Sequence, residues 1–570
     1  MRDQEPERAR RLHERASQWL EDNGHGIEAV EHALKAHAFV RAARLLERLE
    51  LYEQGQMDLQ ERLAERIPQG VLEQFPNLQL ERNWGWQSGW EFAKCRLALG
   101  RLRRLLREWR SGARAVPADV DLDYVAAKLA HRELMVAFVS DDMKTTRRLC
   151  EHWLAAGHPS DRHMEVSTRG ALMAARREHY CCEDTAGTAA ALHEVYQQAR
   201  FSFGEIFQDC ITGTTLLMQA EVVAARQVYD RALKGASALH GRLSLLASMP
   251  ALLLAELHYE RGELAEARAL ITDYLPLAHG LGYVDKLIAG FMTKSRLELL
   301  EGRYDSAQRT LDDAQRYADA TGFARLRAHA LAERLRQLVL LGRQAEVQEI
   351  ARRAGLLGSS LGHQPHGAVT THDEMMALAW SRAAEARGEL DAPIRLLKNW
   401  YQHTLEHRCH RNAARLAVEL ARLLHARHDR SAACHHLCQA LRLALPGGLI
   451  QVFLDGGGEI REVLLATVSG TALTDAEREL AQGILKSFGG LRLHVARDVA
   501  PEPGQPADLN RRERDILELA AGDVPNREIA RRLALSENTV KWYWKRIFAK
   551  LAVSRRLQAV NSARAAGVIF

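Results

Sequence analysis

Apolar residues along most of this chain recur every three or four positions, and a turn residue, often Gly, interrupts them at regular distances. This spacing is typical of amphipathic helices joined by short turns. The segments RGELAEARAL, EGRYDSAQRTL and LGRQAEVQEI align so that Gly262, Gly302 and Gly342 stand at equal steps of 40 residues. The hydrophobic pattern therefore predicts a tandem array of helix pairs.

The same frame extends in both directions, to Gly388 and His428 downstream and to Ala220 upstream. A small residue follows the turn by five positions in several repeats, namely Ala225, Ala267, Ala307 and Ala433. A small side chain lets the two helices of a pair approach closely, and each pair buries its apolar stripe against the next. We therefore expect an all-α tetratricopeptide-like α-solenoid. It would offer a concave surface, while its Leu and Ala stripes would be core.

Composition agrees with a helical protein. The chain of 570 residues contains only 14 Pro, and it is too long for one hydrophobic core. No segment reaches the roughly 18 uninterrupted apolar residues of a membrane span, and the first residues lack the apolar stretch of a signal peptide. We expect a cytoplasmic protein without a membrane partner. Its eight Cys lack the spacing of a small secreted domain and are expected to be thiols.

Changes in composition and in the hydrophobic pattern along the chain suggest domain boundaries. We assign residues 1–454 to the repeat region, 455–495 to a post-repeat helical segment, 496–508 to a Gly- and Pro-rich linker, and 509–570 to a separate C-terminal domain. Near the N-terminus, WGWQSGWEF contains Trp84, Trp86 and Trp90. These rings either line a pocket or fill gaps between helices, and the second interpretation is favoured.

The C-terminal domain carries most of the positive charge. Residues 509–570 hold 13 Lys and Arg against 6 Asp and Glu, whereas the whole chain has a net charge of +5. A basic module on a near-neutral body is typical of a protein that binds a polyanion, although a solvated basic surface would have the same composition.

The pattern of this domain predicts a helix-turn-helix. Asn510 and Glu513 have the form of a capping box, and Gly522 ends the first helix. Pro525 and Asn526 begin a second helix, and Ser536 is a good N-cap for a third. Two short helices joined by so tight a turn are typical of DNA-binding domains.

The third helix contains SENTVKWYWKRIFAKL, with adjacent aromatic and basic residues. A buried seam is predicted at i, i+4, i+7 and i+11, formed by Val540, Trp544, Ile547 and Leu551. Trp544 should therefore be core and Tyr543 should lie at the boundary. The opposite face would meet DNA through Lys541, Trp542, Lys545 and Asn538.

These residues carry a resemblance to the LuxR-type (GerE-type) helix-turn-helix family over about sixty residues. The matching positions are Leu509, Glu513, Asn526, Glu528, Ile529, Ala530, Leu533, Ser536, Thr539, Val540, Lys541, Ile547, Lys550, Leu551, Val553, Arg556 and Ala559. The resemblance implies a four-helix domain that binds double-stranded DNA as a homodimer through a fourth helix at about 555–566. It further implies base contacts from Lys541, Trp542 and Lys545, and phosphates near Asn538, Thr539, Arg546 and Lys550. Asn526 and Ser536, at the starts of two helices, complete the predicted interface.

Three positions depart from that family. Asn510 stands where the first cap is usually Thr, Tyr543 where the third helix often has His, and Trp544 where a small or aliphatic residue is usual. Asn510 should still cap its helix, whereas the other two differences are expected to alter groove contacts and packing in detail.

The body resembles the large ATP-binding LuxR family of MalT-like regulators, on LHERASQWLEDNGHGIEAVEHALKAHAFVRAARLLERL and LCQALRLALPGGLIQVFLDGGGEI. The resemblance implies a sensor region that binds a small-molecule or protein effector, with RNA polymerase as a further candidate partner. The sequence contains no G-x-x-x-x-G-K-[ST] loop, so no ATP or other cofactor is expected. A receiver domain is not recognisable either, which argues against control by phosphorylation.

Catalytic motifs are lacking. HTLEHRCHRN and CHHLC gather His and Cys, but the repeat frame explains the Cys as core, so no metal is expected. No G-x-S-x-G elbow occurs, and we expect no enzyme. The favoured hypothesis is a transcriptional regulator whose solenoid senses an effector or partner. The alternative is a scaffold or inhibitory partner of a full-length regulator, in which DNA binding is secondary.

Overall fold

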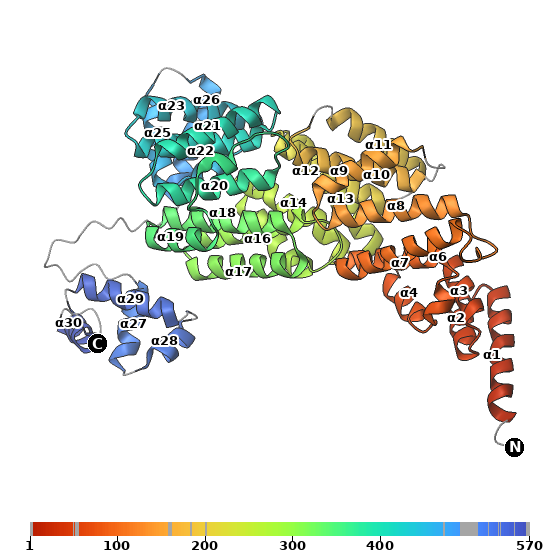
Figure 1. Ribbon diagram of the computed structural model, residues 1–570. Helices are drawn as coiled ribbons and strands as arrows, with labels where there is room; N and C mark the ends of the chain where they lie inside the picture. The colour runs from red at the N-terminus through yellow and green to blue at the C-terminus, as the bar shows by residue number, and fades with distance from the viewer. Residues whose placement is uncertain are drawn as a thin grey trace. The chain divides into compact units, whose positions relative to one another are not determined.

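The computed structural model describes residues 4–49, 51, 56–157, 162–182, 185–199, 202–470, 473–490, 511–522, 524–533, 535, 537–551, 553 and 555–565. Contacts divide the chain into two compact units, Met1–His494 and Val495–Phe570 (Figure 1). The assigned linker, residues 496–508, lies outside the described residues, as does the predicted cap Asn510.

The expectation of an all-α solenoid is confirmed, since the described residues contain helices and no strand. The helices before the repeat array are α1 (Gln4–Asp22), α2 (Gly26–Lys35), α3 (Phe39–Arg48), α4 (Met57–Ala64), α5 (Gln69–Leu72), α6 (Pro76–Ser88) and α7 (Phe92–Arg110). The first helices of the successive pairs are α8 (Leu122–Val139), α10 (Arg162–Glu178), α12 (Ser202–Met218), α14 (Leu245–Glu260), α16 (Asp285–Leu300), α18 (Ala324–Leu340), α20 (Thr371–Glu385) and α22 (His410–Ala426).

Each of these is followed by the second helix of its pair. The second helices are α9 (Met143–Ala155), α11 (Thr185–Ala199), α13 (Val222–His240), α15 (Leu264–Tyr274), α17 (Tyr304–Thr321), α19 (Gln344–Arg353), α21 (Asp391–Glu406) and α23 (Arg430–Ala444). The array ends with α24 (Gln451–Leu454), α25 (Gly457–Val468) and α26 (Asp475–Gly490), and two short 3₁₀ turns, η1 (Leu275–Leu277) and η2 (Ser360–His363), lie within it.

From the pair α12–α13 to the pair α22–α23, the turn inside each pair has a left-handed residue at the position that the sequence frame predicts. The φ angle is 76° at Gly262 and 81° at Gly388, and it is also positive at Ala220 (65°) and His428 (64°). Five positions later a buried small residue packs against the first helix, as Ala267 does. The frame therefore records a backbone requirement, which Gly meets at least cost.

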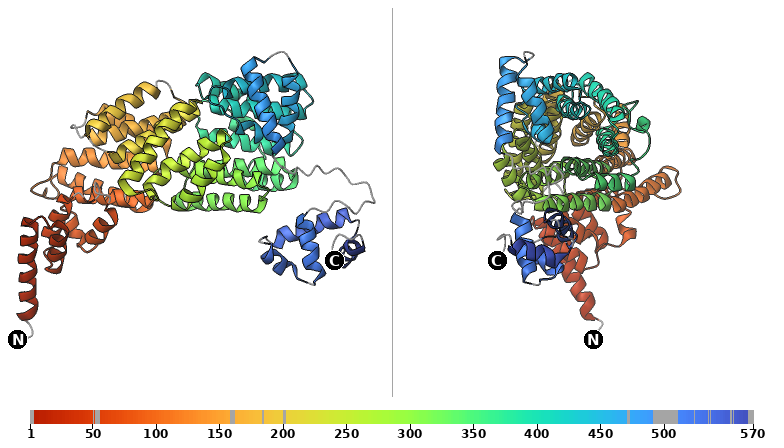
Figure 2. Two further views of the ribbon diagram at one scale, coloured as in Figure 1. Left: turned by 180° about the vertical axis from the view of Figure 1, so that it is seen from behind. Right: turned by 90° about the vertical axis from the view of Figure 1, so that its left-hand side faces the viewer.

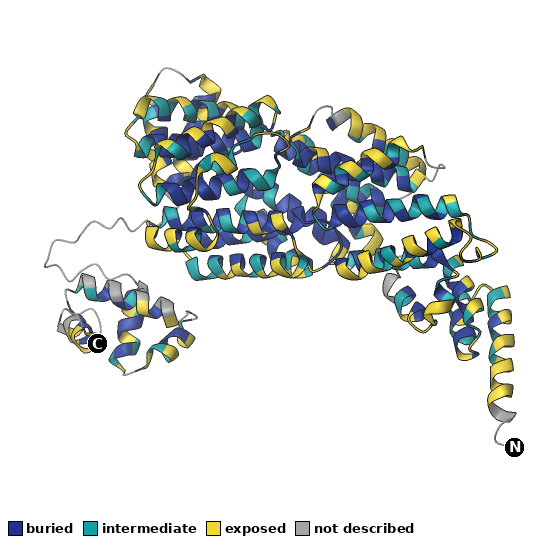
Figure 3. Cartoon of the chain, in the orientation of Figure 1, coloured by how far each residue is buried: buried dark blue, intermediate teal, exposed yellow. Residues whose placement is uncertain are grey.

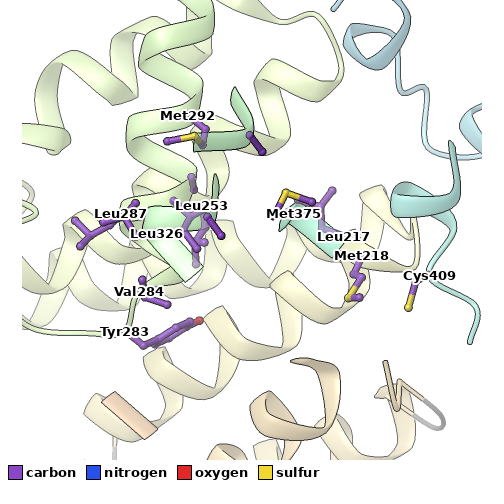
Figure 4. Close-up of a cluster of buried hydrophobic side chains, with 14 of the residues drawn as sticks. Leu217, Met218, Leu253, Tyr283, Val284, Leu287, Met292, Leu326, Met375 and Cys409 are labelled. Carbon is purple, nitrogen blue, oxygen red and sulfur yellow. The ribbon is translucent and has the colours of Figure 1, made fainter. Parts of the chain in front are cut away.

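The first helices of the pairs form the interior of the body. In α14, for example, 14 of 16 residues are buried, whereas the second helices expose one side (Figure 3). Leu253 of α14, Leu287 of α16, Leu326 of α18 and Met375 of α20 contribute to one continuous hydrophobic cluster (Figure 4). The expectation that the apolar stripes are core is confirmed.

The array closes on itself after one superhelical turn (Figure 2, right). Helix α22 contacts α12, and α24 contacts α14. Arg411 of α22 pairs with Glu256 and Glu260 of α14, at 2.6 and 2.5 Å. The Ile450 amide also donates to the Glu260 carbonyl at 2.9 Å.

Charged side chains fill the space inside this closed turn. The half-buried Arg296 and Arg336 pair with the buried Glu333, and Arg382 pairs with Glu419 at 3.3 Å. The cavity that these residues line holds only about 60 Å³. The concave surface expected from the sequence is therefore largely occupied by ion pairs along this part of the array.

Candidate nucleic-acid interface

The described residues of the C-terminal unit form four helices, α27 (Arg511–Ala521), α28 (Asn526–Arg532), α29 (Glu537–Lys550) and α30 (Arg556–Ala565). Pro525 precedes α28 in an extended conformation, which suits its fixed φ. The Leu535 amide donates to the Ala530 carbonyl at 2.8 Å, so the chain turns sharply between α28 and α29. The predicted helix-turn-helix is thus present, with α29 as its second helix.

Three of the four residues predicted for the seam of α29 are buried, and the fourth, Leu551, is half-buried. Val540 and Ile547 are fully buried, and Trp544 is 5% exposed. They pack with Ile516 and Leu517 of α27 in a separate hydrophobic core. Tyr543 is half-buried, as expected for the boundary between the two faces. The prediction that Trp544 is core and Tyr543 lies at the boundary is therefore confirmed.

Trp544 joins three helices. Its indole N–H donates to the Asn526 carboxamide oxygen of α28 at 3.0 Å. The guanidinium of Arg556, from α30, lies 5.3 Å from the centre of the indole ring, and it also donates to the Val524 carbonyl at 2.5 Å. A buried indole N–H requires an acceptor, so Trp544 and Asn526 together set the position of α29 relative to α28.

These contacts were missed by reasoning from the sequence, which assigned Asn526 to the DNA interface. Because Trp544 was predicted to be buried, its indole N–H needed an acceptor, and a search for that acceptor could have identified the bond. The structure uses the Asn526 oxygen inside the domain, while its half-buried side chain remains at the start of α28.

Lys541 is exposed on α29, away from the buried seam. The side chains of the other predicted DNA contacts lie outside the described residues, and so does the whole of Ser536. They are Asn538, Thr539, Trp542, Lys545, Arg546 and Lys550. Their helical positions still follow from α29, in which residues 538, 541, 542 and 545 share one face.

Part of the positive charge of this unit is offset locally. Glu528 accepts from Arg531 at 2.7 Å and from Arg532 at 2.9 Å. Hydrogen bonds from these two arginines lower the pKa of Glu528 to about 2. Arg531 and Arg532 are therefore less available to a phosphate than Lys541.

Comparison with known families gives two matches. Residues 128–469, more than half of the chain, match the model of the MalT-like TPR region. The chain belongs to the MalT-like family. Residues 507–563 of this MalT-like chain match the model of bacterial regulatory proteins of the luxR family. The second match covers all the described residues of α27, α28 and α29 and most of α30.

Individual relatives cover different parts of the MalT-like chain. The serine/threonine-protein kinase PknK of Mycobacterium tuberculosis is 30% identical over 339 residues, which cover 58% of this chain and 29% of that protein. The HTH-type transcriptional regulator MalT of Vibrio cholerae is 28% identical over 202 residues, covering 33% and 22%. MalT of Yersinia pestis is 21% identical over 598 residues, covering 97% and 61%. The chain thus spans less than two thirds of each of these relatives.

The His and Cys residues of the MalT-like array do not form a metal site in the described part of the chain. Among the described residues no three His, Cys, Asp or Glu side chains gather as metal ligands would. Cys438 is buried in the array and Cys434 is half-buried. No helix within the described ranges is long and apolar enough to cross a membrane.

Proposed function

We propose that this protein is a DNA-binding transcriptional regulator in which a helical-repeat body senses an effector or partner and controls DNA binding by the C-terminal unit. The observation that carries the proposal is the luxR-family match on a folded helix-turn-helix with Lys541 exposed on its second helix. The MalT-like body supports a sensing role. We further propose a cytoplasmic, non-catalytic protein, since its relatives include transcriptional regulators.

DNA reading is assigned to one face of α29. Lys541, Trp542 and Lys545 would contact base edges in the major groove, and Asn538, Thr539, Arg546 and Lys550 would lie near phosphates. A homodimer would place two such helices on paired half-sites. RNA polymerase is the partner through which a bound regulator would act.

The test is selection of bound sequences from a random DNA pool by the full-length protein. We expect the native protein to select a motif with paired half-sites, and the variant with Lys541→Ala and Lys545→Ala to select none. The slope of log affinity against log salt concentration should become shallower by about 0.9 for each phosphate that the variant no longer neutralises. The matched control is Lys144→Ala with Lys234→Ala, which removes the same charge from exposed positions of the body.

Two results would contradict the proposal. If the double variant selects the native motif, α29 is not the reading element. If neither the native protein nor residues 509–570 alone selects any motif, a regulator that reads DNA is wrong, and protein partners of the solenoid become the question.

A further inference from the structure

A second cavity of about 310 Å³ lies near the start of the repeat array. Its walls come from α6, α8, α10 and α12, with Tyr196 of α11 and the loop residues Leu281 and Gly282. This volume is about five times that of the cavity inside the closed turn, and it falls in the range of small-molecule sites.

Six of the side chains in the walls are aromatic. They are Trp84, Tyr124, Phe138, Tyr196, Phe203 and Phe207. Of the three tryptophans noted in the sequence, Trp84 therefore lines a pocket, whereas Trp86 and Trp90 are packed in the core. Gly170 and Gly204 also line the cavity. Such a lining favours a flat, apolar ligand.

The charged groups of the walls are already satisfied by one another. Lys128 pairs with Glu81 at 2.6 Å. The Arg132 guanidinium lies 4.1 Å from the centre of the Trp84 ring and donates to the Leu80 carbonyl and to His131 Nδ1, at 3.2 and 2.8 Å. The walls therefore have little need of a charged ligand.

These bonds also determine the state of His131. Its Nδ1 accepts from Arg132, so its Nε2 carries the proton and donates to Ser167 Oγ at 2.8 Å. Ser167 Oγ in turn donates to the His163 carbonyl at 2.7 Å. Burial lowers the pKa of His131 well below its usual value, which keeps the ring neutral.

Two acceptors in the walls have no such partner. Gln87 is 4% exposed and Gln208 is 3% exposed, and the carboxamide oxygens of both are buried without a hydrogen bond from the described residues. The Gln208 amide nitrogen donates to Thr212 Oγ1 at 3.2 Å. This bond turns the Gln208 oxygen towards Gly170, where an added Cβ would lie only 2.6 Å from it. A buried acceptor without a hydrogen bond is unfavourable, and a donor on a ligand would relieve this cost.

We propose that this cavity binds a small, uncharged aromatic ligand whose O–H or N–H groups donate to the carboxamide oxygens of Gln87 and Gln208. The ligand is then the effector of the regulator, an inference that rests on the proposed function. The aromatic walls supply apolar contact, and the two acceptors select ligands that carry donors.

The cavity lies between two segments of the chain, so a ligand bound in it could stabilise their association. The Leu281 amide donates to the Ser88 carbonyl at 2.7 Å, and the Trp90 indole donates to the Gly282 carbonyl at 3.3 Å. The cavity thus lies where the turn after α6 meets the loop before α16. A ligand seated there contacts both segments and stabilises their association.

The test uses three classes of probe on the full-length protein, measured by titration calorimetry without DNA. The probes are the isomers of dihydroxynaphthalene, the corresponding dimethoxynaphthalenes, which cannot donate, and naphthoate, which is charged. We expect at least one diol to bind in the micromolar range. Its dimethyl ether and naphthoate should bind at least tenfold more weakly.

The variants Gln87→Met and Gln208→Met should each weaken binding of that diol about tenfold or more, while leaving the weak binding of the ether unchanged. Gly170→Ala, which crowds the Gln208 oxygen, should have the same effect. The matched control is Gln439→Met, which removes a buried carboxamide oxygen outside the cavity. Circular dichroism melting curves should show that each variant is folded.

The proposal is overturned if no diol binds the native protein, if the ether binds as tightly as the diol, or if Gln439→Met weakens binding as much as the cavity variants. Preferred binding of naphthoate would also overturn it and would indicate an anion site at Lys128 and Arg132. None of these results affects the DNA-selection test, so a failure here is distinguishable from a failure of the proposed function.

Discussion

Several residues of this protein adopt an unfavourable backbone conformation, and their side-chain contacts compensate for the cost. Tyr180 has a positive φ of 61°, which is unfavourable for a bulky residue, yet its hydroxyl donates to Glu374 at 2.6 Å from a fully packed position. Trp90 has a φ of 59°, and its ring lies edge-on to Phe323. Both residues occupy turns that Gly could form at lower cost, so their contacts outweigh the strain.

Lys286 is the clearest case of a buried charge. It is fully buried, with its amine donating to the Gly280 carbonyl at 2.6 Å and to Ser248 at 3.2 Å. Burial lowers its pKa to about 7, whereas the unfolded chain has a Lys pKa of about 10.4. At pH values between these two pKa values, the Lys286 amine is protonated in the unfolded chain but not in the folded protein.

This difference predicts a pH dependence. The unfavourable effect of the buried charge is full below about pH 7 and is relieved as pH rises towards about 10. The free energy of unfolding of the native protein, relative to Lys286→Met, should therefore rise by up to about 1.4 kcal/mol per pH unit in that window. Urea unfolding at a series of pH values measures it. Lys144→Met, at an exposed position, is the control, and parallel curves for native protein and Lys286→Met would contradict the prediction.

At the scale of helices, the common feature of the repeats is the left-handed turn between the two helices of a pair, more than any sequence motif. The Gly positions of the frame were readable because Gly marks a left-handed turn. The turns at His37, Asp141 and Tyr180 have the same conformation without Gly. Buried residues follow them by five positions, as Ala42 and Thr146 do. The N-terminal pairs repeat less cleanly in sequence because tertiary contacts hold these turns.

Two equivalent turns offer a test of this view. His428 is exposed with a φ of 64°, and Gly388 occupies the corresponding turn with a φ of 81°. We expect His428→Gly to stabilise the protein by about 0.5–1 kcal/mol, because it relieves left-handed strain. Gly388→Ala should destabilise it by a similar amount, and an added Cβ there would meet no atom within 4 Å. Thermal unfolding measures both, and equal midpoints for the two variants would rule out strain as the cause.

The helix-turn-helix could also be predicted from the sequence, because it depends on local patterns. Its turn and its apolar seam are local patterns, so the burial of Val540, Trp544 and Ile547 follows from helical spacing alone. The bond between Trp544 and Asn526 is different, because it joins two helices whose crossing no local pattern specifies.

At the scale of the whole repeat body, closure of the superhelical turn is the main feature that the pattern did not predict. Arg411 connects α22 to Glu256 and Glu260 of α14, more than 150 residues earlier. Burial raises the pKa of Glu260, but the charges of Arg411 and Arg296 outweigh this and hold it below its usual value. These ion pairs fasten the two ends of the turn.

Removing Arg411 should therefore open or destabilise the closure. We expect Arg411→Ala to lower the free energy of unfolding by up to about 3–5 kcal/mol, because the buried carboxylate of Glu260 and the half-buried carboxylate of Glu256 lose a counter-charge. The control is Arg352→Ala, whose partner Glu349 is on the surface and whose loss should have a much smaller effect. Urea unfolding compares the two. An Arg411→Ala effect no larger than the control would mean that closure does not depend on this pair, whereas partial recovery on adding Glu256→Gln and Glu260→Gln would support it.

Three features of this protein follow from the sequence alone, namely the all-α class, the repeat frame with the positions of its turns, and the helix-turn-helix with its apolar seam. All three depend on contacts within a few turns of helix, whose periodicity the chain displays directly. Three others emerge only in three dimensions: the superhelical turn closes, ion pairs fill its interior, and the walls of a cavity between α6, α8, α10 and α12 contain two unpaired carboxamide oxygens. These features depend on residues far apart in the chain, brought together by small rotations between successive helix pairs that no local pattern encodes.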